Sequence, residues 1–202
     1  DPSDIAALAA EDSIVALSDD GDPVVDPDLV EAIFGLCAKL DVMASPHCED
    51  SPATLERIAQ GVDPGFEPDE PYHNEANYIE RDIRLARKTG CRVHFSHVSL
   101  WDSMQAILAA RDKGAHPPTI TWEVAPHHLL LCREDYEQGE VPLVNPPIRP
   151  AVERDRLRRA FCEGKVDCLA SDHAPHTAED KADGACGLIG METTLGLILT
   201  HM

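Results

Sequence analysis

Short apolar runs alternate along the chain with longer segments in which apolar residues recur every three or four positions. The first pattern is typical of buried β-strands, and the second is typical of helices that turn one face toward a core. Asp26 and Pro27 supply an N-cap and a first-turn proline for one helix, and Gly90 and Gly164 are placed to end two others. The pattern predicts strands at 13–18, 42–45, 91–98, 119–124 and 166–170, and helices at about 27–40, 74–89, 103–113, 152–163 and 191–199.

This alternation, without a hairpin signal, predicts parallel strands that are covered by helices. Such a sheet is either doubly wound or closed into a TIM-type barrel. The catalytic residues of a barrel gather at the carboxyl ends of several strands, whereas a nucleotide-binding sheet carries a glycine-rich phosphate loop, which this chain lacks. Ligand-type side chains follow the strands in turn: Asp19, Asp20, His47, His97, His127, His128, Asp172 and His173. We therefore favour the barrel.

The fold class is thus α/β, a (β/α)8 TIM-type barrel, but the number of strands is low. We count five strands in the sequence, and a closed barrel needs eight. The 202 residues, 43% of them hydrophobic, are enough for one domain with a core. We expect a single domain over residues 1–202 that supplies about five βα units of an incomplete barrel.

Charge and composition exclude several classes of function. With 17 basic and 37 acidic residues the formal net charge is −20, which disfavours nucleic acid and anionic membranes as partners. The apolar stretches are shorter than the roughly 18 residues of a membrane span, and residues 1–12 lack the pattern of an export signal. Seven cysteines without a C-x-x-C pair are expected to be reduced, buried residues of a cytoplasmic protein.

The strand-end residues have the chemistry of a metal site. Zinc prefers imidazole nitrogens and carboxylate oxygens, and a catalytic zinc site keeps one position open for water. Two histidines and two aspartates from four strand ends supply such a set. Any one of the ten histidines is weak support, because a strand-end histidine is more often structural. Their joint occurrence at strand ends is the stronger indication.

Motifs at these strand ends carry a specific resemblance. They are SDDG (18–21), HCED (47–50), HFSHVS (94–99), EVAPHHLLL (123–131), NPPIR (145–149) and DHAPH (172–176). In this order they resemble the dihydroorotases of the amidohydrolase superfamily, in particular the bacterial type I, whose bridging metal ligand is an aspartate. HCED, NPPIR and DHAPH separate dihydroorotases from the similar allantoinases and hydantoinases. The resemblance covers most of the chain, which would form the C-terminal part of a metal-dependent hydrolase barrel.

The resemblance implies a centre that holds one or two Zn2+ ions. By this resemblance Asp20 is the bridging carboxylate, and His47 and His97 are ligands of the second metal ion. Asp172 is implied to be a ligand of the first metal ion that also moves protons.

The implied reaction is the reversible hydrolysis of the cyclic amide of dihydroorotate to carbamoyl aspartate, in pyrimidine synthesis. Water activated by the metal would attack the ring carbonyl. Asp172 would accept the proton and return it to the departing nitrogen. Asn145 and His176 match positions that hold the ring and the carboxylate of the substrate. Because the substrate is an anion and the chain is acidic, these two residues must offset the overall field.

Several neighbouring residues are expected to have supporting roles. Asp19 cannot share the role of the adjacent aspartate, because successive side chains of an extended segment point to opposite faces. We interpret it as a solvated or loop-capping residue, and His94 as structural for the same reason of alternation. His127 and His128 are interpreted as structural or as supporting the ligands, and residues 48–50 as orienting the His47 loop.

The chain departs from the family pattern in two places. No H-x-H pair precedes Asp20, and the loop 177–188 lacks the longer stretch that usually follows DHAPH. Three explanations stay open: a truncated chain, a sequence that lists only ordered residues, and a short homologue that serves as a non-catalytic scaffold for a carbamoyltransferase. Another cyclic amidohydrolase, an allantoinase or a hydantoinase, is the other functional alternative. The resemblance also implies a homo-oligomer, with aspartate carbamoyltransferase as a candidate partner.

Overall fold

The computed structural model describes residues 2–9, 11, 13–21, 23–48, 73–111, 119–137 and 141–202. Its contacts divide the chain into two compact units, which we describe separately. Unit 1 comprises Asp1–Glu49, His73–Ser96 and Asp102–Trp122. Unit 2 comprises Asp50–Tyr72, His97–Trp101 and Glu123–Met202. The single domain expected over residues 1–202 stays a prediction.

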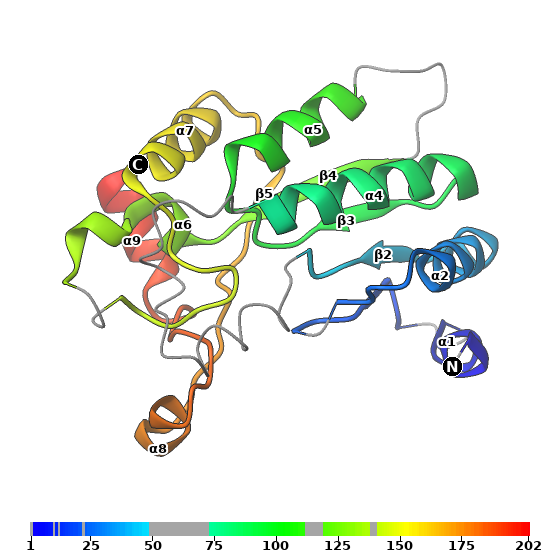
Figure 1. Cartoon of the computed structure of the whole chain (residues 1–202), viewed down its shortest axis with the longest axis horizontal. Coiled ribbons are helices and arrows are strands. Elements are labelled where there is room, and N and C mark those ends of the chain that lie inside the picture. Colours follow the sequence, from blue (N-terminus) through cyan, green and yellow to red (C-terminus); the bar gives the residue numbers. More distant parts are fainter. Residues whose placement is uncertain are drawn as a thin grey trace. The chain divides into compact units, whose positions relative to one another are not determined.

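Unit 1 is built on parallel strands, in the order β1-β2-β3-β4 (Figure 1). Ala16 pairs with Met43, Ala44 with Val93, and Val93 with Ile120, so that each strand is in register with the next one along the chain. The strands are β1 (Ala16–Ser18), β2 (Met43–Ser45), β3 (Val93–Phe95) and the first part of β4 (Ile120–Val124). The helices are α1 (Pro2–Ala9), α2 (Pro27–Leu40), α4 (His73–Thr89) and α5 (Trp101–Arg111), of which the first residue, Trp101, belongs to unit 2.

The helices of unit 1 begin and end where local chemistry requires it. The Asp26 side chain accepts a hydrogen bond from the Asp28 N–H at 3.0 Å, and Pro27 occupies the first turn of α2. Gly90 follows α4 with φ +77°, a left-handed conformation that glycine adopts without a steric penalty. Both signals could be read from the sequence, and both helices lie within one residue of their predicted limits.

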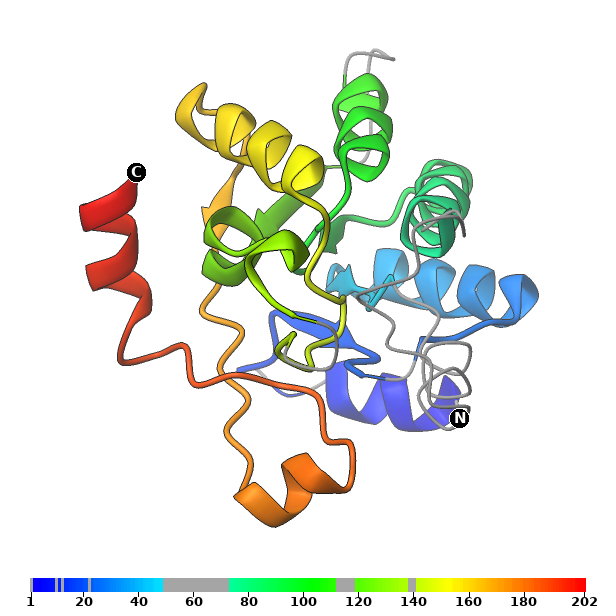
Figure 2. The same cartoon turned by 60° about the vertical axis from the view of Figure 1, so that its left-hand side comes forward.

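Unit 2 contains the second half of β4 and the short strand β5 (Cys168–Leu169), which pair in parallel through Glu123 with Cys168 and Val124 with Leu169. Figure 2 shows α8 at the tip of the long segment that connects β5 with α9. The helices are α6 (Pro126–Leu130), the 3-10 turn η1 (Arg133–Asp135), α7 (Ala151–Cys162), α8 (Ala178–Ala182) and α9 (Thr194–His201).

The five predicted strands are confirmed as parallel strands, but each is shorter than its apolar run. Phe95, Trp122 and Val124 have no exposed surface, so the strands supply the centre of the core. The helices α1, α6 and α8 were not predicted. In the part of the chain that the structure describes, no helix is both long and apolar enough to cross a membrane.

Candidate active site

In unit 1, two predicted ligands follow neighbouring strands. Asp20 comes after β1 and His47 after β2, and a carboxylate oxygen of Asp20 lies within 4.8 Å of a ring nitrogen of His47. His47 is buried, with 3% of its surface exposed, whereas Asp20 is exposed. The carboxyl ends of parallel strands face the same edge of a sheet, which explains why residues so far apart in the chain meet.

Asp19 connects the two loops that carry these ligands. Its Oδ1 accepts the backbone N–H of His47 at 2.7 Å, and its Oδ2 accepts the N–H of Val24 at 2.9 Å. One carboxylate therefore satisfies a donor after β1 and a donor after β2. This confirms the interpretation of Asp19 as a loop-capping residue and extends it, because the bond to His47 also fixes the backbone of a predicted ligand.

A buried carboxylate lies behind the His47 loop. Asp82 on α4 is 0% exposed, and it accepts hydrogen bonds from Arg81 Nε at 2.7 Å and from Cys48 Sγ at 3.7 Å. Burial raises the pKa of Asp82, and the Arg81 hydrogen bond partly offsets this effect. Burial and the Asp82 charge raise the pKa of Cys48, so the thiol stays protonated. Cys48 thus supports the loop as expected, while Glu49 and Asp50 lie outside the described residues.

Sequence reasoning did not single out Asp82. The available signal was an ionisable residue beside Ile79, Ile83 and Ala86, which form the apolar face of α4. A charge at such a position requires a partner.

In unit 2, the other two predicted ligands share an unusual backbone. His97 follows β3 with φ +35°, and Asp172 follows β5 with φ +46°. This left-handed region is costly for residues other than glycine, and such strain concentrates at functional positions. Neighbouring bonds hold both turns to β4, since the Val98 N–H donates to Glu123 O at 2.9 Å and the Ala170 N–H donates to Val124 O at 3.1 Å.

Asp172 lies against His127 of α6. Asp172 Oδ2 is 3.4 Å from His127 Nε2, and this nitrogen has no hydrogen-bond partner among the residues that the structure describes. Burial lowers the pKa of His127 to about 4, an effect that the Asp172 charge opposes and the nearby His97 reinforces. His127 is therefore a neutral imidazole at physiological pH.

His128, whose ring lies 4.3 Å from that of His127, makes a hydrogen bond of its own. Its Nε2 donates to Pro146 O at 3.1 Å, and burial lowers its pKa as well. The structural role expected of His128 fits this bond. His94, in unit 1, is bonded through Nδ1 to Thr121 Oγ1 at 2.8 Å, as a structural residue would be.

The two predicted substrate-binding residues lie in loops of unit 2. Asn145 precedes Pro146 through a cis peptide bond. The NPPIR segment that it begins is held to the residues after β3, because Arg149 Nε donates to Ser99 Oγ at 2.8 Å. His176 is exposed, and its Nε2 donates to Cys186 O at 2.9 Å.

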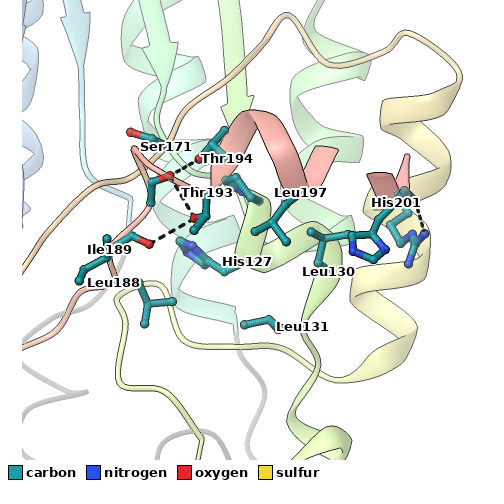
Figure 3. Close-up of a pocket in the computed structure, with 13 residues that line it drawn as sticks. His127, Leu130, Leu131, Ser171, Leu188, Ile189, Thr193, Thr194, Leu197 and His201 are labelled. Carbon is teal, nitrogen blue, oxygen red and sulfur yellow. Dashed lines mark hydrogen bonds between the residues drawn. The ribbon is translucent and has the colours of Figure 1, made fainter. Parts of the chain in front are cut away.

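Beside His127, unit 2 has a cavity of about 340 Å³. Figure 3 shows His127 among the leucine and threonine side chains that line it. The wall comes from α6, α9 and the segment before α9, with Leu130, Leu197 and Ile189 as apolar members and Thr193 as a polar one. His127 belongs both to this wall and to the Asp172 contact, and Ser171, next to Asp172 in the chain, also lines the cavity.

The donor chemistry in each unit fits a divalent metal ion. In unit 1 the Asp20 carboxylate and the His47 imidazole belong to a group that could hold a metal ion, and in unit 2 the Asp172 carboxylate lies 3.4 Å from the His127 imidazole. The buried His127 nitrogen without a hydrogen-bond partner among the described residues is the kind of atom that a cation satisfies. All six predicted site residues are thus described, but their roles stay predictions.

The chain is similar to known proteins in sequence and in structure. No family model matches the chain. A dihydroorotase of Geobacillus thermodenitrificans is 36% identical over 98% of this chain and 47% of its own length. A dihydropyrimidinase of Brevibacillus agri superposes with a TM-score of 0.82 at 20% identity, over 98% of this chain and 47% of that one. A dihydroorotase of Saccharomyces cerevisiae in complex with 5-fluoroorotic acid superposes with a TM-score of 0.75 at 18% identity. The match covers 98% of this chain and 57% of that one.

The structural likenesses confirm the predicted fold class, a TIM-type α/β barrel of which the described residues supply five parallel strands. The chain spans about half the length of the curated relatives that it matches. Over nearly its whole length the chain is homologous to curated dihydroorotases, at 34–36% identity.

Proposed function

We propose that the protein to which this chain belongs is a metal-dependent cyclic amidohydrolase that interconverts dihydroorotate and carbamoyl aspartate. The observation that carries the proposal is the 36% identity with a dihydroorotase over 98% of the chain. The strand-end carboxylate and imidazole pairs in both units support it. We also expect this protein to act in the cytoplasm and to form a homo-oligomer.

We propose Asp20, His47, His97 and Asp172 as the residues that hold one or two Zn2+ ions. When bound, zinc polarises a carbonyl and activates water near neutral pH. Within the chain, Asp19 fixes the His47 backbone through its 2.7 Å hydrogen bond. A fixed ligand binds metal more tightly because less flexibility is lost on binding.

Asp172 is proposed to move the proton from the attacking water to the departing ring nitrogen. A carboxylate performs this role when it is ionised at the operating pH and lies within reach of both atoms. His127, whose Nε2 lies 3.4 Å from Asp172 Oδ2, is a buried and neutral imidazole beside this carboxylate. Asn145 and His176 are proposed to bind the substrate ring and its carboxylate.

A second candidate is hydrolysis of another cyclic amide, such as a hydantoin or a dihydropyrimidine. It is favoured by the solved structures that superpose on the chain, several of which are described as hydantoinases or dihydropyrimidinases. A third candidate is a scaffold without catalysis, assembled with aspartate carbamoyltransferase.

The test uses the complete gene product, purified and reconstituted with Zn2+. We expect stoichiometric zinc and hydrolysis of dihydroorotate, and we expect Asp172→Ala to lower kcat by about 10²–10⁴-fold. Asp155→Ala, which changes an exposed carboxylate on α7, serves as the matched control and keeps full activity. Near-zero zinc after reconstitution would favour the scaffold, and faster hydrolysis of hydantoin or dihydrouracil than of dihydroorotate would favour the second candidate.

A further inference from the structure

The segment between β5 and α9 carries a short helix, α8, whose orientation is set locally. Thr177 Oγ1 accepts the Asp180 N–H at 3.1 Å, and Asp180 Oδ2 accepts the Thr177 N–H at 3.0 Å. This reciprocal capping fixes the first turn. The Ala185 N–H donates to Asp180 O at 2.9 Å and so folds the chain back after the helix. The direction in which the Lys181 side chain extends from α8 is therefore fixed.

The Lys181 ammonium group is bonded to three backbone carbonyls. Its Nζ donates to Leu143 O at 2.9 Å, to Ala185 O at 2.8 Å and to Gly187 O at 3.0 Å. An ammonium group has three N–H donors and no acceptor, so these bonds use its full capacity. Hydrogen bonds from a charged donor are stronger than those from a neutral one, and here they join two segments about forty residues apart in the chain.

These two segments carry the proposed substrate-binding residues. Leu143 lies two positions before Asn145, and its carbonyl also accepts the Gly187 N–H at 2.9 Å. Between the other two carbonyls lies Cys186, whose own carbonyl accepts the hydrogen bond from His176 Nε2 at 2.9 Å. Lys181 is thus linked to both residues through backbone carbonyl groups.

We infer that Lys181 is a positioning residue that sets the spacing between Asn145 and His176, and hence between the groups that bind the ring and the carboxylate of the substrate. The inference rests on the proposed function. The backbone at Gly187 packs closely against the residues before His176, since a Cβ at Gly187 would lie 2.4 Å from Ala174 O. The segment around Gly187 therefore has little freedom to move on its own. A preorganised pair binds substrate more tightly because less ordering is needed on binding.

The test compares Lys181→Met with Lys165→Met in the zinc-loaded, complete gene product. Lys165 forms an exposed ion pair with Glu163 in the same unit and is the control. For Lys181→Met we expect KM for dihydroorotate to rise about tenfold with kcat within about twofold of wild type, because binding groups are displaced and the proton-transfer carboxylate is not. Hydrogen exchange of the Gly187 amide is expected to accelerate, and the His176 ring nitrogens to change their NMR shifts.

Unchanged exchange at Gly187 together with unchanged His176 shifts in Lys181→Met would overturn the inference, whatever the activity. A fall in kcat with no change in KM would also overturn it, because the lysine would then act on the chemical step. If the wild-type protein binds zinc but does not hydrolyse dihydroorotate, the proposed function fails, and the exchange and NMR measurements still decide whether Lys181 holds the two segments.

Discussion

Replacing Arg81 by methionine tests how the buried Asp82 carboxylate is stabilised. The substitution keeps most of the aliphatic stem but removes the Nε–H that lies 2.7 Å from Asp82 Oδ1. Because the Asp82 side chain has no exposed surface, water cannot replace the lost partner. Breaking a buried ion pair from one side costs about 3–5 kcal/mol, and since Arg81 itself is 15% exposed we expect the lower value, about 3 kcal/mol.

The assay is urea unfolding of the purified chain at pH 7 and pH 5. Arg92→Met is the control, because Arg92 pairs with Asp41 at the surface and such a pair contributes about 0–1 kcal/mol. The pKa of Asp82 in the folded state lies above its ordinary value of 3.8, so between these two values the native state keeps a proton that the unfolded state releases. Stability therefore falls as the pH rises through that window.

Loss of the guanidinium group raises the folded-state pKa of Asp82 further, which extends the window to higher pH. The deficit of Arg81→Met relative to wild type is therefore expected to shrink from pH 7 to pH 5. The double variant with Asp82→Asn is expected to recover part of the loss at pH 7, because the buried charge is gone. Equal losses in Arg81→Met and Arg92→Met, or a deficit that does not change with pH, would refute this reasoning.

Two further predictions concern the loops around the candidate site. Gly187→Ala places a Cβ 2.4 Å from Ala174 O, at φ +147°, and is expected to lower the free energy of unfolding by about 3 kcal/mol in thermal unfolding. Gly184→Ala, at φ +94° with open space around it, is expected to lower it by about 1 kcal/mol. Similar losses of stability in the two variants would contradict the close approach of Gly187 to Ala174 O. Asp19→Asn removes one of the two side-chain oxygens that accept backbone N–H groups, and we expect it to weaken zinc binding, measured by calorimetry, about tenfold. Asp26→Asn, at the N-cap of α2, is the control and is expected to keep wild-type affinity.

The helices could be predicted where local signals agree. For α2 the cap Asp26 and the proline after it mark the start, and for α4 a buried stripe and Gly90 mark the face and the end. The helix α6 was not predicted because its apolar residues continue the run that begins in β4. Pro126, at the first turn of α6, was the available signal. The strands are shorter than predicted because the backbone hydrogen bonds between strands end where the backbone turns, whereas the apolar run of the sequence continues beyond that point.

The candidate site could be predicted in part, for a reason of topology. Residues at the carboxyl ends of parallel strands share an edge, so Asp20 and His47 could be expected to meet. The contact of Asp172 with His127 depends on the direction of α6, which the sequence pattern did not reveal. The role of Lys181 could not be predicted, because its partners are carbonyl groups, and every residue has one.

At His97 and Asp172 the left-handed backbone makes thermal stability conflict with the side chain that the proposed metal site needs. With φ values of +35° and +46°, both residues carry a conformational cost of about 1–2 kcal/mol that glycine would not. A variant library screened only for survival after heating will therefore accumulate glycine at these two sites. The same survivors will lack the imidazole or the carboxylate that we propose as metal ligands, and we expect them to bind less zinc.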